Sequence, residues 1–499
     1  MGSEMCIRDS PGTVPPRFHP EATKNRDCSK TSSSCHLCMK SSKTLIVIGG
    51  GIAGLTAAYF ASRAGHRVIL IERAPSLGGR IRAVRPTPEN VPIDWGQHLL
   101  LGAYHETLRL AGMLGTRNKI HTITGATPFI EPYGKLHHYR ISSLPTPLHV
   151  VPGLFALGHL SLRERFMLGR AAFASARDLK KHPTTLDTMT AQKWLAAHGQ
   201  GKRAIARFWD TFIVSTLNTP PAEASAYLFA VVLNRGVLTS ARETRGMLHE
   251  TTLAATLVEP AAAAIAASGG TILAGRRALR LLIRDNRLRG VEEDSGTIHK
   301  ADAVILAVPP WHVIPLCDTI PELSPLAAAA RRFTPSPILS VDLWFDRHWL
   351  PYRMASPIGG RFHWFFSHPS REPLGFRVSL VLSAAEGMIR EPDDQIRAFA
   401  CEEITRFFPT APVIAKHSFI IRETRATFRA VPGLEQVRPA PETQINGLFL
   451  AGDWTATGLP ATIEGAVLSG RRAAEAVCRF FASVDNRSCP SIMRQPCLH

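Results

Sequence analysis

Three glycines near the amino end of the chain have the spacing of a pyrophosphate-binding turn. Gly49, Gly51 and Gly54 form the pattern GxGxxG directly after the apolar run 45–48. In this pattern one glycine permits the tight turn, one lets a pyrophosphate approach the backbone, and one lets a helix pack closely on a strand. The helix that begins here presents free amides and the positive end of its dipole, which suits a diphosphate.

A carboxylate and a second glycine turn extend this site. Residues 66–71 read as the next strand, and Glu72 follows them, where a carboxylate can accept both hydroxyls of an adenosine ribose. Gly78 and Gly79 permit another close backbone approach, and the guanidinium of Arg80 can pair with a phosphate. Strand, glycines, helix, strand and acid in this order predict a dinucleotide site.

A late segment of the chain favours a flavin over a nicotinamide dinucleotide. Residues 448–450 read as a buried strand, Gly452 and Asp453 follow it, and a long helix begins near Ile463. Asp453 is placed to hold a ribityl chain. The amides at the start of the helix can stabilise negative charge at the edge of an isoalloxazine ring.

The elements that must position these residues predict an α/β fold, in which a discontinuous FAD-binding Rossmann-like domain is joined to an α+β substrate domain. We assign residues 44–115, 236–314 and 421–481 to the FAD-binding domain, and residues 116–235 and 315–420 to the substrate domain, where alternating strands predominate. Residues 1–43 are polar and aperiodic, so they are expected to be a disordered or artefactual leader. Residues 482–499 are expected to be a disordered tail.

Composition narrows the class of protein. Of 499 residues, 45% are hydrophobic and 20% charged, as in a soluble globular enzyme, and no apolar run approaches the ~20 residues of a membrane span. The formal charge of +18 favours an anionic surface or ligand, but no basic motif interleaved with aromatic residues indicates nucleic acid. Most cysteines lie in the tails, which suits a reducing compartment. Cys35 and Cys38 lack a second pair at ligand spacing, so no metal site is expected.

The chain from 45 to 477 resembles the squalene-associated FAD-dependent desaturase family. The resemblance rests on the runs VIGGGIAGLTAA, GGR, DWGQHLLLGAYHETLRL, LNTPPAEAS, ADAVILAVPPW, RATFRAVPGLEQVRP and LFLAGDWTATGLPATIEGAVLSGRRAAEA. The glycine motifs are shared with the wider amine oxidase and phytoene desaturase superfamily, whereas GQHLLLGAY and AGDWTATGLPAT are specific to the family. The chain departs from the family pattern at Trp95, where asparagine is usual.

This resemblance implies a reaction and a set of site residues. Reduced FAD would replace the hydroxyl of hydroxysqualene with hydrogen, giving squalene for hopanoid synthesis. His98 is the candidate proton donor because its ordinary pKa lies near operating pH; Gln97 would lie beside the flavin, and Asp94 is expected to fix the loop. The expected contacts to FAD are Gly49, Gly51, Gly54, Glu72, Arg73, Gly79, Arg80, Gly96, Ala278, Gly452, Asp453, Pro460, Ala461, Thr462 and Ile463.

A triterpene alcohol is too insoluble to arrive through water, so we expect a cytoplasmic protein held peripherally on the inner membrane. Residues 136–182 are both apolar and basic. They can be core helices with solvated basic faces, or a patch that binds anionic lipid. The residues assigned to such a patch are Leu154, Phe155, Leu157, Phe166, Arg163, Arg165, Lys180 and Lys181.

An external electron donor and the upstream squalene-pathway synthases are expected as further partners. Three other functions remain open. They are a carotenoid-type desaturase that runs in the opposite redox direction, a flavin amine oxidase, and a flavin-free prenyl-lipid carrier.

Overall fold

The computed structural model describes residues 42–87, 89–412 and 414–484. The leader up to residue 41, with Cys35 and Cys38, and the tail beyond Val484 lie outside these ranges. From Ser42 onward the chain forms one compact unit. The division into two domains therefore stays a prediction, which rests on the segments that share each large sheet.

The first sheet has five parallel strands. Its order is β10-β2-β1-β14-β20, with bounds Thr44–Ile48 (β1), Arg67–Glu72 (β2), Thr271–Ala274 (β10), Ala303–Leu306 (β14) and Leu448–Leu450 (β20). Leu45 of the central strand pairs with Val68 on one side and Ala303 on the other. These strands are continuous apolar runs because both faces of the sheet are covered.

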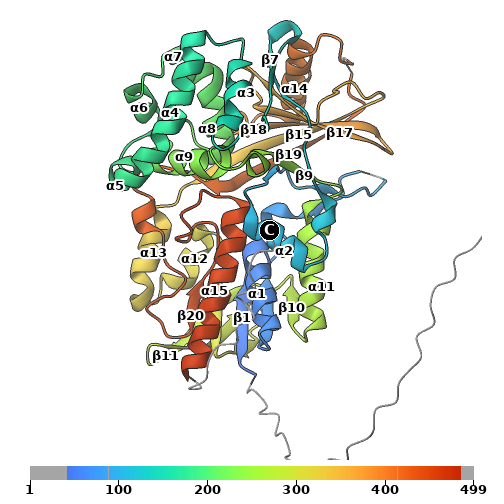
Figure 1. Ribbon diagram of the computed structural model, residues 1–499. Coiled ribbons are helices and arrows are strands. Elements are labelled where there is room, and N and C mark those ends of the chain that lie inside the picture. The colour runs from blue at the N-terminus through green and yellow to red at the C-terminus, as the bar shows by residue number, and fades with distance from the viewer. Residues whose placement is uncertain (1–41, 88, 413, 485–499) are drawn as a thin grey trace, which may run out of the picture. The chain divides into compact units, whose positions relative to one another are not determined.

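Three helices cover one face of this sheet (Figure 1). They are α1 (Ile52–Arg63), α11 (Glu259–Ala267) and α15 (Ile463–Val484), and they share one apolar cluster with β1. The predicted helix near Ile463 therefore begins where expected. Helix α15 crosses α1 closely because residue 470 is glycine: a Cβ on Gly470 would lie 2.2 Å from the carbonyl oxygen of Ala53.

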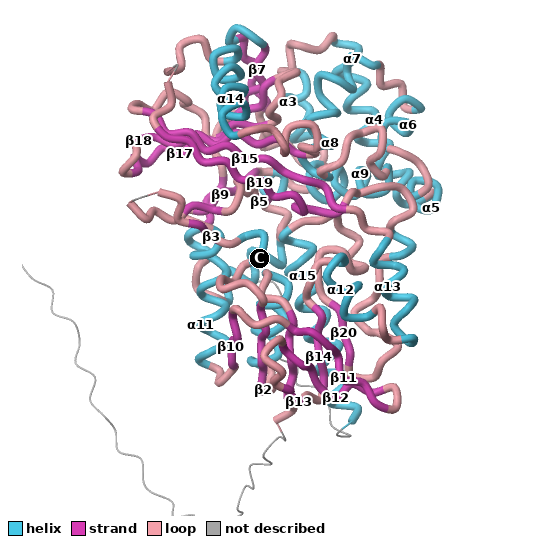
Figure 2. The backbone as a smooth tube through the Cα atoms, turned by 180° about the vertical axis from the view of Figure 1, so that it is seen from behind, coloured by secondary structure: helices cyan, strands magenta, loops and turns pink. Residues whose placement is uncertain are grey.

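A smaller sheet and two helices cover the opposite face, which Figure 2 shows. The antiparallel strands are β11 (Ala278–Arg284), β12 (Arg287–Glu293) and β13 (Ile298–Lys300), and the helices are α12 (Pro310–Cys317) and α13 (Ser324–Arg331). Asp285 and Asn286 both have positive φ and form the turn between β11 and β12. The buried side chains between these elements and the five-stranded sheet form a second apolar cluster.

The second large sheet has seven strands in the order β19-β15-β18-β17-β16-β7-β8. Their bounds are Thr127–Glu131 (β7), Lys135–Tyr139 (β8), Pro335–Phe345 (β15), Met354–Pro357 (β16), Trp364–Glu372 (β17), Gly375–Ser383 (β18) and His417–Phe428 (β19). Neighbours are antiparallel except β16 and β7. Helix α14 (Asp393–Phe407) packs on this sheet. The expected domain boundary at 420–421 lies within β19. Separate parallel and mixed sheets with helices confirm the predicted α/β fold class.

Helices between β8 and β9 form the cap seen at the upper left of Figure 1, beside the second sheet. They are α3 (Val151–Phe155), α4 (Leu162–Lys181), α5 (Pro183–Asp187), α6 (Ala191–Ala197), α7 (Lys202–Ala204), α8 (Asp210–Leu217) and α9 (Ala226–Val232). Helix α4 begins with a capping box between Ser161 and Glu164. Leu154 and Leu157, which we placed on a membrane-facing patch, are buried at 9% and 0% exposure. They pack in the core of this cap, so that part of the patch was wrong.

Short elements hold the segment that contains the expected catalytic residues. They are β3 (Ala83–Val84), β4 (Ile93–Asp94), β5 (Leu100–Leu101), β6 (Ile120–Thr122), β9 (Gly246–His249), α2 (His105–Met113) and α10 (Ala241–Thr244). Strand β4 pairs with β3, and β9 lies between β5 and β6. Residues 94–104 are therefore anchored at both ends.

Candidate flavin site and substrate chamber

The three glycines of the first motif have different surroundings. A Cβ on Gly54 would lie 1.9 Å from the carbonyl oxygen of Gly49, and a Cβ on Gly49 would lie 2.4 Å from that of Ala307. A Cβ on Gly51, the residue before α1, would meet nothing within 4 Å. Gly49 and Gly54 therefore let strands and helix pack, whereas Gly51 leaves open space at the positive end of α1, where a phosphate can bind.

Glu72 ends β2 and holds the glycine turn. Its carboxylate accepts hydrogen bonds from the amide of Gly50 at 2.6 Å and from the amide of Ala74 at 2.8 Å. An ionised carboxylate has about four acceptor sites, so Glu72 can also accept from a ribose. The neighbouring Arg73 is exposed at the cavity mouth.

Arg80 and Asp453, which we assigned to different parts of the cofactor, bind each other. The two guanidinium nitrogens of Arg80 donate to the two carboxylate oxygens of Asp453 at 2.9 and 3.0 Å, and one also donates to the carbonyl of Ala426 at 2.8 Å. Burial lowers the pKa of Arg80, but Asp453 and the charge of Glu423 more than offset it, so the pKa lies above its ordinary value. The pair thus fixes η1 (Gly79–Ile81) to the loop after β20.

The segment 94–98 joins this site to the second large sheet. Asp94 accepts a hydrogen bond from the amide of Leu253 at 2.8 Å and lies 2.9 Å from His249, which agrees with its expected role in fixing the loop. Trp95, the departure from the family pattern, donates from its indole to Glu423 of β19 at 2.8 Å. The guanidinium of Arg82 stacks 3.9 Å from the Trp95 ring centroid. Trp95 therefore ties the loop to the sheet.

Gln97 and the candidate proton donor His98 both line the cavity, as expected. Gln97 donates from its amide to the carbonyl of His98 at 3.2 Å. Nδ1 of His98 is buried and has no hydrogen-bond partner among the residues that the structure describes. Burial lowers the pKa of His98, and Asp94 only partly offsets this, which disfavours the cationic acid form.

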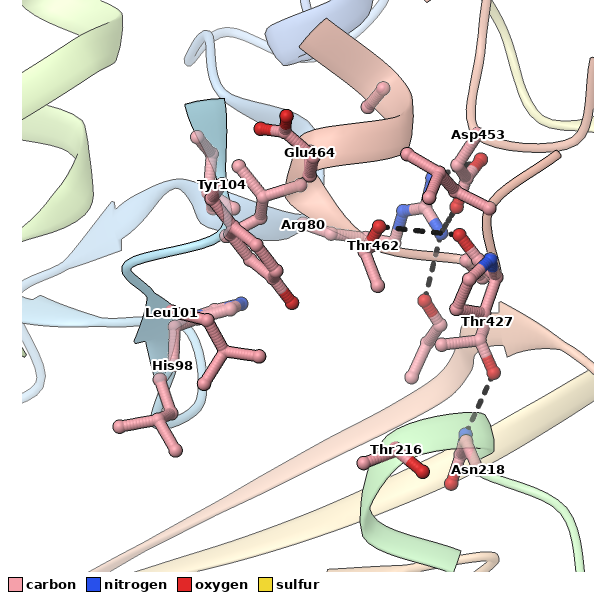
Figure 3. Close-up of a pocket in the computed structure, with 18 of the residues that line it drawn as sticks. Arg80, His98, Leu101, Tyr104, Thr216, Asn218, Thr427, Asp453, Thr462 and Glu464 are labelled. Atoms are coloured by element: carbon pink, nitrogen blue, oxygen red, sulfur yellow. Dashed lines mark hydrogen bonds and ion pairs between the residues drawn. The ribbon is translucent and has the colours of Figure 1, made fainter. Parts of the chain in front are cut away.

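One cavity of about 1790 Å³ brings the predicted site residues together. Every expected catalytic and cofactor-binding residue lines it except Gly54, which lies behind the turn. Ligand cavities of drug-sized molecules are roughly 300–1,000 Å³, so this one has room for a dinucleotide and a second ligand. Figure 3 shows Arg80, Asp453 and Thr462 on one side of the space and His98 and Leu101 on the other.

Arg73 was expected to contact FAD, but several other cavity-lining cations were not predicted from the sequence. Arg73, Arg276, Arg277 and Arg425 line the cavity, and none has a carboxylate within ion-pair distance among the described residues. Burial, then Arg73, Arg425 and Arg277, lower the pKa of His312 to about 4. Arg425 also lies 5.9 Å from the ring centroid of Trp311. Unpaired guanidinium groups beside an aromatic ring suit a pyrophosphate and a planar base.

No group of three or more His, Cys, Asp or Glu residues able to hold a metal ion occurs within residues 42–87, 89–412 and 414–484. Over the same ranges, no helix is long and apolar enough to cross a membrane.

Comparison with known proteins agrees with this geometry. Residues 52–478 match the family described as Flavin containing amine oxidoreductase. A hydroxysqualene dehydroxylase of Rhodopseudomonas palustris is 31% identical over 87% of this chain and 98% of its own. A 15-cis-phytoene desaturase of Synechococcus elongatus is 26% identical over 89% and 97%. The solved cyclohexylamine oxidase of Brevibacterium oxydans is similar in fold, with a TM-score of 0.67 and 16% identity over 89% of this chain and 100% of that chain.

The cofactor is a flavin, and the residues present fit FAD. The open space at Gly51, the acceptor capacity of Glu72 and the unpaired arginines suit its ribose and pyrophosphate. The alternative of a flavin-free carrier is therefore wrong, since the relatives are flavin enzymes. The chain belongs to the Flavin containing amine oxidoreductase family, as an FAD-dependent oxidoreductase grouped with the hydroxysqualene dehydroxylases.

Proposed function

We propose that this enzyme reduces hydroxysqualene to squalene, within squalene and hopanoid synthesis. The observation that carries the proposal is the second half of the cavity, which continues from the dinucleotide site into an apolar chamber. Its lining includes Leu154, Leu168, Phe208, Phe212, Val231, Met354, Phe366 and Val381. Such a chamber suits a long hydrocarbon, and three relatives are named hydroxysqualene dehydroxylase at 26–31% identity.

The chain's residues would make the chamber dry and hold the substrate against the cofactor. Reduced FAD supplies a hydride. Loss of water from an allylic alcohol leaves a delocalised cation, which survives to accept that hydride only where bulk water is excluded. The chamber walls serve this end because two of their polar side chains, Ser215 and Asn234, are already hydrogen-bonded within the protein. Ser215 accepts from the indole of Trp364 at 2.7 Å, and Asn234 donates to Ser175 at 3.0 Å.

A phytoene-type desaturase is the second candidate, because relatives of that name are 23–26% identical over most of the chain. It would draw hydride from a polyene into oxidised flavin. A flavin amine oxidase is less favoured, since residues 458–462 of the loop before α15 read Gly-Leu-Pro-Ala-Thr and lack the second aromatic residue of an amine cage.

The flavin spectrum separates these candidates. We expect anaerobic enzyme reduced with dithionite to regain the oxidised flavin absorbance when hydroxysqualene is added, with squalene formed in equal amount. Phytoene should leave the reduced spectrum unchanged. If phytoene bleaches the oxidised enzyme while hydroxysqualene does nothing to the reduced enzyme, the chain is a desaturase.

We further propose that the substrate enters from an anionic bilayer through the helical cap. Helix α4 carries an exposed apolar stripe, with Leu162 at 67%, Phe166 at 64% and Phe173 at 41% exposure. Their spacing of four and seven residues places them on one face. On the other face Leu168 and Ala172 line the cavity, so one helix separates the chamber from the stripe.

Positive charge accompanies this stripe. Arg163, Arg170, Lys180 and Lys181 of α4 are exposed, and Phe155 nearby is 48% exposed. Each basic residue near an anionic membrane contributes about 1 kcal/mol to the free energy of membrane binding. Exposed aromatic side chains that insert into the bilayer strengthen the binding further. The revised patch for lipid binding is Phe155, Leu162, Phe166, Phe173, Arg163, Arg170, Lys180 and Lys181. Arg165 is excluded from it because its guanidinium donates to the carbonyls of Leu160 and Phe155.

We expect the double change Lys180→Glu and Lys181→Glu to weaken binding to anionic liposomes by about 4 kcal/mol, at about 1 kcal/mol for each unit of charge changed. Turnover of membrane-presented substrate should slow, while the flavin spectrum and activity in detergent stay unchanged. Co-sedimentation with phosphatidylglycerol vesicles measures the binding.

The matched control is Arg284→Glu with Lys300→Glu, the same charge change on exposed residues of β11 and β13, which should bind liposomes nearly as the wild type does. Equal loss in both double variants would show that net charge, not this patch, governs binding. If Lys180→Glu with Lys181→Glu leaves liposome binding intact, and Phe155→Ser and Phe166→Ser do the same, the entrance lies elsewhere.

A further inference from the structure

Tyr104 presents an unpaired hydroxyl to the cavity. It is the last residue of the GQHLLLGAY run and precedes the first residue of α2. Its side chain lines the cavity, and its hydroxyl makes no hydrogen bond within residues 42–87, 89–412 and 414–484. Figure 3 shows the phenol pointing into the open space, with its oxygen toward the side that holds Thr462 and Thr427.

Glu464 fixes this tyrosine beside the amino end of α15. The carboxylate of Glu464, the second residue of α15, accepts hydrogen bonds from the amides of Glu106 and Thr107, both at 2.9 Å, and from the hydroxyl of Thr107 at 2.8 Å. It thereby satisfies amides that the first turn of α2 leaves unpaired. Glu464 is 8% exposed, so this contact is buried. The start of α2, and Tyr104 before it, cannot move independently of α15.

Other polar groups near this position are already engaged. The side chain of Asn218 donates to the carbonyl of Ser336 and to the hydroxyl of Thr427, and it accepts from the amide of Ala384. The lowered pKa of His98 disfavours its protonated form, as described above. Burial and the charge of Glu464 raise the pKa of Tyr104, so its phenol keeps its proton throughout the physiological range.

We propose that Tyr104 is a catalytic residue that binds the hydroxyl of the allylic alcohol and gives its proton to that oxygen. This assignment rests on the proposed function. The carbon–oxygen bond breaks, water leaves, the carbon receives a hydride from reduced flavin, and the phenolate regains a proton from solvent. The proton moves as the carbon–oxygen bond breaks, because the departing oxygen then approaches the basicity of hydroxide, which is a stronger base than a phenolate.

The test compares Tyr104→Phe with Tyr227→Phe, which removes the same oxygen from a partly buried tyrosine outside the cavity. In single turnovers of the reduced holoenzyme with hydroxysqualene, Tyr104→Phe should reoxidise its flavin about 10²–10⁴-fold more slowly. Tyr227→Phe should match the wild type. The wild-type rate should fall in deuterium oxide, and Tyr104→Phe should lose that dependence.

Binding gives a readout that does not depend on turnover. With oxidised enzyme, quenching of tryptophan fluorescence should show that Tyr104→Phe loses about 2- to 10-fold of the wild-type preference for hydroxysqualene over squalene, the loss expected for one hydrogen bond. Unchanged squalene affinity shows that the chamber is intact.

The two proposals fail differently. If the wild type reoxidises with hydroxysqualene and Tyr104→Phe keeps both the rate and the preference for the alcohol, Tyr104 is not the donor and the proposed function stands. If the wild type itself does not respond to hydroxysqualene, the proposed function fails and this assignment fails with it.

Discussion

Gly51→Val should yield a folded protein that no longer binds FAD. The structure leaves more than 4 Å of free space around a Cβ at this position, so the valine disturbs no neighbour, but it fills the place where a phosphate meets the amides of α1. Loss of two charge-assisted hydrogen bonds, at roughly 1.5–3 kcal/mol each, weakens binding by more than about 100-fold. Flavin absorbance after dialysis and circular dichroism of the same sample measure the two outcomes.

Two further variants sharpen this prediction. Gly54→Val should instead damage folding, because its Cβ would lie 1.9 Å from the carbonyl oxygen of Gly49. Glu72→Ala should leave weak but measurable flavin binding, since it removes one ribose acceptor and loosens the turn that Glu72 holds through Gly50. Full flavin content in Gly51→Val would show that the dinucleotide lies elsewhere.

Arg80→Leu should destabilise the protein by about 3 kcal/mol, because it leaves the buried carboxylate of Asp453 without its cation. The estimate is at the low end of the usual 3–5 kcal/mol because the Arg80 side chain is 33% exposed, against 5% for Asp453. Replacing both residues with leucine should recover part of this loss, since no unpaired charge remains. Urea unfolding at saturating FAD measures the free energies.

The control for this prediction is Arg280→Leu, which breaks an ion pair with Glu292 at a side chain that is 71% exposed. Surface pairs contribute about 0–1 kcal/mol, so this variant should be close to wild type. If Arg80→Leu and the double variant are equally stable, the pair is not a source of stability and its role is limited to the cofactor.

The parts of the fold predicted correctly from sequence are those whose signals are local. The strand, glycine turn and helix at 44–63 follow from neighbouring residues, as do β2, β20 and the start of α15. The contacts of Arg80 with Asp453 and of Glu464 with α2 join residues more than 350 positions apart. No pattern within either segment specifies its partner, because the pairing depends on how the elements assemble.

Leu154 and Leu157 were wrongly assigned to the lipid-binding patch for a different reason. We read residues 136–182 by composition, which mixes apolar and basic residues without regard to direction. Helical periodicity separates Leu162, Phe166 and Phe173, which face outward, from Leu168 and Ala172, which face the cavity. Leu154 and Leu157 precede this helix and pack in the same apolar cluster. Because they lie outside α4, its helical periodicity could not predict their burial.

The strand order of the parallel sheet has a consequence for how the chain is made. The central strand β1 is synthesised near the start, but β20 and α15 complete the sheet and pack on α1 only after about 400 more residues, which at 5–20 residues per second takes roughly 20–80 s. During that time the apolar face of α1 that receives Gly470 has no partner. Nascent chains should therefore depend on chaperones until the last helix emerges, and a stop codon before residue 448 should give aggregated protein rather than a folded fragment.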